Sequence, residues 1–142
     1  NSKIKIIRPS NVVGITAPAN LFIPSLIKEA VTAGKIVLHS TLDSEKDYVY
    51  IDDLVELIPK IIFSTKFQLY NIASGYNISS SKIINEIIRL TDCKLEIASN
   101  AKKFSSGQIN IDRIKTEFNF VPINIIEKIE NIIKFYQTLN KN

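Results

Sequence analysis

The spacing of apolar residues along the chain changes between two periods, one typical of strands and one typical of helices. Strict alternation or short apolar runs bounded by turn residues predict β-strands, whereas apolar residues three and four positions apart predict helices. The strand-like stretches are 3–8, 35–39, 47–51 and 68–73, with shorter extended pieces at 94–98 and 108–111. The helix-like stretches are 20–33, 52–64, 79–90, 112–118 and 124–136.

Residues that begin or end helices stand beside these stretches. Gly34 ends the first helix-like stretch, and Ser79 is a suitable N-cap for the third. Asp52 is an expected N-cap for the second, in which Pro59 predicts a kink or an early stop. Asn124, with Glu127 three residues later, has the spacing of a capping box.

Strands that alternate with helices indicate an α/β fold. Because helices lie between 3–8 and 68–73, we expect these two strands to pair in parallel. A parallel pair needs helical cover on both faces, and the chain has few helices to supply it. Its 142 residues suffice for one compact domain with its own core.

Composition narrows the class of protein. Hydrophobic residues make up 45% and charged residues 23%, as in soluble globular proteins, and no apolar run approaches the roughly 20 residues of a membrane span. The charged start of the chain is unlike a signal peptide, and the single Cys93 fits a reducing cytoplasm as a buried, inert thiol. The net charge of +4 leaves an anionic small ligand and a nucleic acid open. Lys102 and Lys103 are the only adjacent basic pair, so a basic nucleic-acid-binding tract is lacking.

Several blocks in unbroken order carry a resemblance. They are Arg-Pro-Ser-Asn-Val-Val-Gly at 8–14, Asn-Leu-Phe-Ile-Pro at 20–24, Lys-Asp-Tyr-Val-Tyr-Ile-Asp-Asp at 46–53, Tyr-Asn-Ile-Ala-Ser-Gly at 70–75, and the ending at 112–122. The set resembles the carboxyl-terminal part of extended short-chain dehydrogenases/reductases, the NAD-dependent nucleotide-sugar epimerase and dehydratase family. Asn119 stands where that family usually has Gly.

The resemblance implies a substrate site. Its nucleotide-sugar contacts would be Asn11, Asn20, Leu21, His39, Lys46 and Lys102, and backbone groups of Pro9 and Ser10 would approach the nicotinamide. Each residue also has a simpler interpretation. Asn11 could be a turn residue and Asn20 a plain N-cap. His39 could be a half-buried strand residue, and the two lysines could lie on solvated loops. Lys46 replaces the family's usual Arg, so it supplies a point charge in place of a planar fork. Asp52 and Asp53 look like paired carboxylates, but helix capping explains them.

The family's catalytic residues are missing from this sequence. None of Tyr48, Tyr50, Tyr70, Tyr76 and Tyr136 has Lys four positions later, and the Gly-rich phosphate loop is absent. One His and one Cys cannot form a metal site of the usual kinds. We therefore expect no catalytic residue in this chain, and NAD(P) to be bound by the parent enzyme rather than by the chain alone.

These expectations combine into one hypothesis. Residues 1–142 would form a single substrate-binding domain that contains the last strands of an incomplete Rossmann-type sheet, with the N-terminal dinucleotide-binding domain absent. Asn11, Asn20 and Lys46 would converge on one pyrophosphate-sized pocket. Exposed sheet edges could allow self-association. The alternatives are a non-catalytic binding or assembly module and, with less support, a basic nucleic-acid binder. The sequence fixes neither the sugar nor the reaction of the parent enzyme.

Overall fold

A computed structural model describes residues 4–15 and 20–140. Its strands are β1 (Ile6–Pro9), β2 (Asn11–Val13), β3 (Lys35–Ser40), β4 (Glu45–Tyr50), β5 (Leu69–Ile72), β6 (Asn77–Ser79) and β7 (Lys94–Lys102). Its helices are α1 (Phe22–Ala33), α2 (Ile51–Phe63), α3 (Ser80–Thr91), α4 (Asp112–Phe118) and α5 (Ile129–Leu139), the last preceded by the 3₁₀ turn η1 (Ile125–Lys128).

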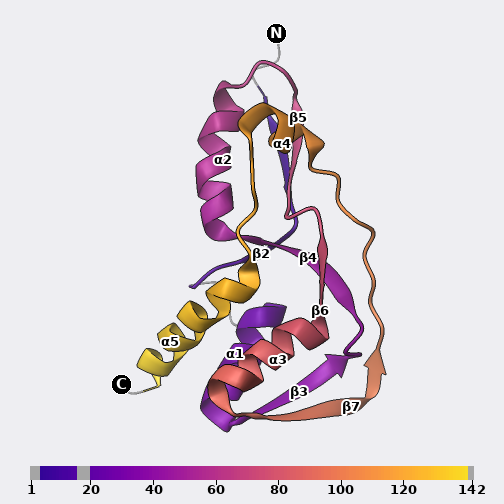
Figure 1. Cartoon of the computed structure of the whole chain (residues 1–142), viewed down its shortest axis with the longest axis vertical. Helices are drawn as coiled ribbons and strands as arrows, with labels where there is room; N and C mark the ends of the chain where they lie inside the picture. The colour runs from indigo at the N-terminus through magenta and orange to yellow at the C-terminus, as the bar shows by residue number, and fades with distance from the viewer. Residues whose placement is uncertain (1–3, 16–19, 141–142) are drawn as a thin grey trace.

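Within the described residues, the strands form three small sheets. The pairs β1–β5, β2–β4 and β3–β7 are parallel, and β6 joins β4 in the antiparallel sense. The expected parallel pairing of the first strand with 68–73 is confirmed, since Ile6 lies opposite Leu69 and Pro9 opposite Ile72. In Figure 1, β1, β5, α2 and α4 occupy one half of the molecule, and β3, β7, α1, α3 and α5 the other. The chain is thus an α/β structure, with β4 running from one half to the other.

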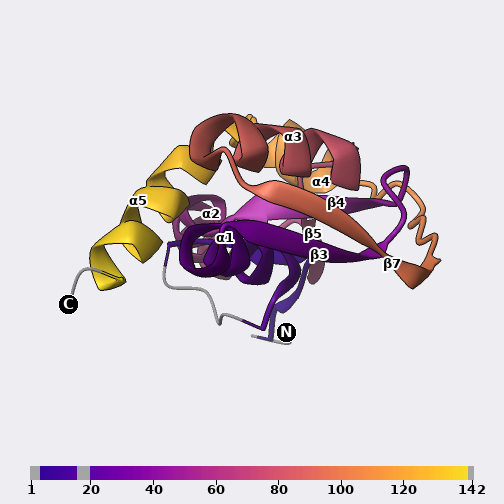
Figure 2. The ribbon, with the colours of Figure 1, turned by 90° about the horizontal axis from the view of Figure 1, so that it is seen from below.

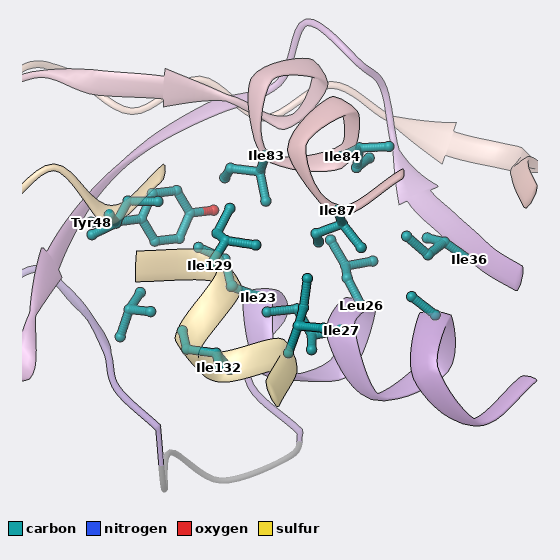
Figure 3. Packing of buried hydrophobic residues seen from close by; sticks show 14 of the residues in the cluster. Ile23, Leu26, Ile27, Ile36, Tyr48, Ile83, Ile84, Ile87, Ile129 and Ile132 are labelled. Carbon is teal, nitrogen blue, oxygen red and sulfur yellow. The ribbon is translucent and has the colours of Figure 1, made fainter. Parts of the chain in front are cut away.

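The apolar core is divided between the two halves. The larger cluster packs α1, α3 and α5 together, and Figure 3 shows isoleucines from all three helices facing one another. Figure 2 shows α3 on one side of the β3–β7 pair and α5 beyond the end of this strand pair. The smaller cluster joins β5, α2 and α4. Strand β4 belongs to both, because Tyr48 and Tyr50 enter the larger cluster whereas Val49 enters the smaller.

The predicted helices are present, but two of their expected caps are wrong. Helix α1 begins at Phe22 with Leu21 as its N-cap, so Asn20 lies outside the helix. Helix α2 has Tyr50 at its N-cap position, and neither of these caps makes a side-chain hydrogen bond.

Other end signals hold. Ser79 caps α3 by accepting from the backbone N–H of Lys82, and Gly34 ends α1 in the left-handed conformation at φ 62°. Asn124 accepts from the N–H of Ile126, while its amide donates to the Glu127 carboxylate, a variant of the expected box. Pro59 lies inside α2 without ending it.

The strand prediction is less complete. Strands β2 and β6 have three residues each and were not expected, and β7 extends to Lys102 instead of ending at residue 98. The segment 108–111 forms no strand. Three-residue strands carry too little periodicity to be recognised, because their pairing depends on distant partners.

Gly75 makes the turn after β5 at φ 80°, and a β-carbon there would meet the Ile111 side chain at 2.8 Å. Replacing Gly75 with Ala is expected to lower the free energy of unfolding by about 2–4 kcal/mol, because strain and overpacking act together. Gly34→Ala is the matched control. Gly34 also has positive φ, but nothing lies within 4 Å of its β-carbon position, so a loss of only about 1–2 kcal/mol is expected. Urea unfolding of both variants measures the difference, and equal losses would contradict the contact with Ile111.

Candidate functional site

Two hollows share a pair of stacked rings in their linings. Phe22 at the start of α1 and Tyr48 on β4 stack with ring centroids 6.5 Å apart and an interplanar angle of 21°. Both rings line a cavity of about 200 Å³, which we call the Phe104 cavity, and a smaller one of about 70 Å³, which we call the Asn11 cavity. The two cavities therefore share one aromatic wall.

The Phe104 cavity has mainly apolar walls with several polar groups. Its aromatic residues are Phe22, Tyr48 and Phe104, and its polar lining includes Glu29, His39, Ser40 and Lys46. The ammonium of Lys46 lies 5.3 Å from the centroid of the Phe104 ring, a cation–π contact. A mainly apolar surface with polar groups placed in it is the usual form of a small-molecule site. The volume is below the roughly 300–1,000 Å³ of a whole drug-sized ligand, so the cavity suits one planar part of a larger molecule.

The Asn11 cavity lies along β2 and has no charged group among its described lining residues. Asn11, Val13 and Leu21 line it beside the two shared rings. The Asn11 side-chain amide donates to the backbone carbonyl of Asp47 at 2.8 Å, which links β2 to β4. Asn11 therefore has a structural bond across the sheet instead of the local turn bond that was the simpler alternative.

The structure brings some of the predicted binding residues together and separates others. Asn11 and Leu21 share the Asn11 cavity, whereas His39 and Lys46 share the Phe104 cavity. Asn20 is exposed and lines neither cavity. The expected convergence of Asn11, Asn20 and Lys46 on one pocket is therefore not found; two of them line neighbouring cavities instead.

The remaining predicted residues lie at the margins. Lys102 ends β7 and lines neither cavity, although its register partner Ser40 lines the Phe104 cavity. Lys103 forms an exposed ion pair with Asp43 at 2.6 Å. Ser10 donates its backbone N–H to Ile72 at 2.9 Å. Ser10 also donates its hydroxyl to Asp47 at 2.7 Å. Both Ser10 donors are thus engaged within the chain, and neighbouring Pro9 has no N–H.

Asp47 holds this region together, a role that the sequence did not reveal. Its carboxylate is buried and accepts four hydrogen bonds. The donors are the Ser10 hydroxyl at 2.7 Å, the Ser74 N–H at 2.9 Å, the Ser74 hydroxyl at 3.0 Å and the Gly75 N–H at 2.7 Å. With the Asn11 bond to its carbonyl, Asp47 joins β4 to the β1–β2 junction and to the turn after β5.

Asp52 and Asp53 differ in role despite their adjacency. Asp52 is exposed in the first turn of α2, near the positive end of the helix dipole. Asp53 is buried, and its carboxylate accepts from the N–H of Ile123 at 3.1 Å, which ties α2 to the segment before η1. Burial raises the pKa of the Asp53 carboxyl. A raised folded-state pKa means that folding favours the protonated form of the Asp53 carboxyl. The stability that this carboxyl contributes is therefore fully present below its unfolded-state pKa and is lost as pH rises through its folded-state pKa.

Comparison with known proteins identifies the family. The sequence pattern of the NAD dependent epimerase/dehydratase family matches residues 1–73, which hold β1 to β5 and the walls of the Asn11 cavity. The chain belongs to the NAD dependent epimerase/dehydratase family. The resemblance expected from the ordered sequence blocks is confirmed.

Two solved structures share this fold. TunA, an NAD dependent NDP-hexosamine 5,6-dehydratase involved in tunicamycin biosynthesis, superposes with a TM-score of 0.80 at 17% identity, covering 96% of this chain and 46% of TunA. MoeE5, solved in complex with UDP-glucose and NAD, superposes with a TM-score of 0.77 at 15% identity, covering 94% of this chain and 47% of MoeE5.

A curated relative is similar in sequence as well. GDP-6-deoxy-D-talose 4-dehydrogenase from Aggregatibacter actinomycetemcomitans is 26% identical over 98 residues, which are 68% of this chain and 33% of the relative. The chain thus spans about a third of that relative and just under half of the two structures. In the part of the chain that the structure describes, no helix combines the length and apolarity needed to cross a bilayer.

Proposed function

We propose that this chain forms the nucleotide-sugar-binding part of an NAD(P)-dependent epimerase or dehydratase. The observation that carries the proposal is the pair of cavities that share the rings of Phe22 and Tyr48. The Phe104 cavity would hold the nucleobase between apolar walls, and His39 would stack on it at the rim. The diphosphate would extend towards Asn11 and Lys46, with the sugar beyond.

The site residues would contribute different interactions to binding, according to their chemistry. Lys46 would supply the positive charge for a phosphate oxygen, and Asn11 has an amide that can donate to another. Asn20 and Leu21, before α1, would offer side-chain and backbone groups to the diphosphate, while Lys102 would approach from the end of β7. Pocket shape and these donors would orient the sugar, and the reacting groups would come from outside this chain.

We propose further that the dinucleotide is held chiefly by another part of the protein, and that residues 1–142 act as one substrate-binding unit. NAD(P) would supply the hydride acceptor when bound. The engaged donors of Ser10 support this division, because its N–H and its hydroxyl already have partners within the chain. The apolar side chains of Ile6 on β1 and of Val55 and Phe63 on α2 are exposed. They support the proposal that another surface covers them, either from the dinucleotide-binding part or from a second copy of the chain. Cytoplasmic sugar-nucleotide metabolism, serving surface polysaccharide, is the setting we propose.

Replacing Lys46 with Gln tests the proposed diphosphate contact. We expect titration calorimetry at low salt to show a nucleoside diphosphate bound about tenfold more weakly by Lys46→Gln, because a charge-assisted contact is lost. The affinity for the matching nucleoside should not change. Lys60→Gln, which removes a charge from the Glu56–Lys60 ion pair on α2, is the matched control. Absence of binding by the unsubstituted chain to any nucleoside diphosphate at millimolar concentration would overturn the proposed function.

A further inference from the structure

Glu29 places a carboxylate in the Phe104 cavity. It lies on α1, is half-buried, and accepts the backbone N–H of Val37 on β3 through Oε2 at 3.1 Å. That bond fixes the carboxylate against β3, the strand that carries His39 and Ser40 into the same lining. Within the described ranges 4–15 and 20–140, Glu29 Oε1 accepts no hydrogen bond. Oε1 and the second lone pair of Oε2 therefore remain to accept hydrogen bonds from a ligand.

The charges around the cavity favour a ligand part that donates hydrogen bonds. Its lining holds two carboxylates, Glu29 and Glu45, against the single ammonium of Lys46. Lys46 stands over the Phe104 ring, and no ion pair joins it to either carboxylate among the described residues. A phosphate beside Glu29 and Glu45 would be repelled by their negative charges, whereas a flat ring with N–H groups would be attracted to them.

A second polar group in the lining lacks a partner. Ser40 is 8% exposed, and its hydroxyl oxygen is buried without a hydrogen-bond partner among the described residues. A buried hydroxyl without a partner costs free energy, and such groups are commonly completed by a ligand or water. Its O–H can donate to a carbonyl oxygen. The cavity therefore presents both a strong acceptor and an unused donor.

We propose that Glu29 selects the nucleobase, and that the base is guanine; this inference rests on the proposed function. Guanine carries two adjacent donors, its ring N–H and its amino group, next to a carbonyl oxygen. A carboxylate can accept from both donors, and the Ser40 hydroxyl can donate to the carbonyl. Uracil and thymine have one N–H between two carbonyl oxygens, so at least one oxygen would face the carboxylate. Adenine and cytosine offer an amino group without a neighbouring ring N–H.

Titration calorimetry of the full chain with GDP, UDP, dTDP and ADP tests the proposal. We expect GDP to bind at least tenfold more tightly than UDP or dTDP, because a well-placed pair of hydrogen bonds to a base discriminates by tenfold or more. Glu29→Gln keeps an oxygen for the Val37 N–H and replaces the other by an amide N–H₂. This N–H₂ would face the N–H donors of guanine, and two donors cannot form a hydrogen bond with each other. The preference for GDP over UDP should then fall to within about twofold or reverse.

Matched measurements separate the possible failures. Glu56→Gln removes the same charge from the exposed face of α2 and should keep the GDP preference, and circular dichroism confirms that both variants fold. Tight binding of UDP or dTDP, equal to or better than GDP, would overturn guanine selection and leave the proposed function standing. A GDP preference that survives Glu29→Gln would remove Glu29 as its cause. Absence of binding by all four diphosphates would overturn both proposals.

Discussion

Replacing Asp47 with Ala is expected to lower the free energy of unfolding by about 4 kcal/mol. The variant removes the acceptor of four hydrogen bonds and leaves the N–H groups of Ser74 and Gly75 without their partner. Unpaired buried donors cost about 1–3 kcal/mol each, and breaking a buried charged network costs about 3–5 kcal/mol. Since whole domains are stable by only about 5–15 kcal/mol, much of the chain would unfold at moderate temperature.

Urea unfolding followed by circular dichroism measures this effect. Asp47→Asn keeps one acceptor oxygen but turns N–H₂ towards groups that are themselves donors, so its loss should be intermediate. Asp52→Ala, five residues along the chain in the exposed first turn of α2, is the control and should cost less than about 1 kcal/mol. A loss below about 1 kcal/mol for Asp47→Ala would contradict the described hydrogen bonds.

Replacing Tyr48 with Ala should lower the free energy of unfolding by about 3–5 kcal/mol and also enlarge both cavities. Tyr48 is 4% exposed, and Figure 3 shows its ring reaching between Ile83 and Ile129 in the larger core. The same ring stacks on Phe22 and lines both the Phe104 cavity and the Asn11 cavity. Loss of the ring would therefore weaken the core and remove the shared wall.

Tyr48→Phe is the matched control, because it retains the ring. Burial raises the pKa of the Tyr48 phenol, so the neutral hydroxyl is the form present at neutral pH. We expect a loss of about 1 kcal/mol or less on removing it. Thermal unfolding measures the stability difference, and the affinity for nucleoside diphosphates measures the effect of losing the shared aromatic wall. Equal stability of the Ala and Phe variants would show that the ring does not support the core.

The sequence was sufficient for much of the fold because the relevant signals are local. Long helices such as α3 carry enough apolar periodicity to be found, and Ser79 and Gly34 mark their ends by local hydrogen bonds. The pairing of β1 with β5 followed from the helices between them. Asn20 and Asp52 were placed wrongly as caps, because the N-caps are Leu21 and Tyr50 and a local pattern does not define a helix end to within one or two residues.

The candidate site was predictable only in part. The block 46–53 drew attention to Lys46, yet Asp47 beside it is the better connected residue. The donors to Asp47 are 27 to 37 residues away along the chain. No pattern of residue spacing in the sequence predicts hydrogen bonds between such distant residues. Glu29 likewise occupies a half-buried position of an amphipathic helix in the sequence, and only the fold places it against β3. Phe104 was identifiable only as an aromatic beside two lysines.

The strand pairing described above also affects how fast the chain can fold. Every register between named strands joins residues at least 30 positions apart, from Asp47 with Asn77 to Ile6 with Leu69. The described strands therefore contain no tight hairpin that could form early and guide the rest. Long loops must close before any of these ladders forms, which gives high contact order and folding in the millisecond-to-second range, slower than a helical bundle of the same size.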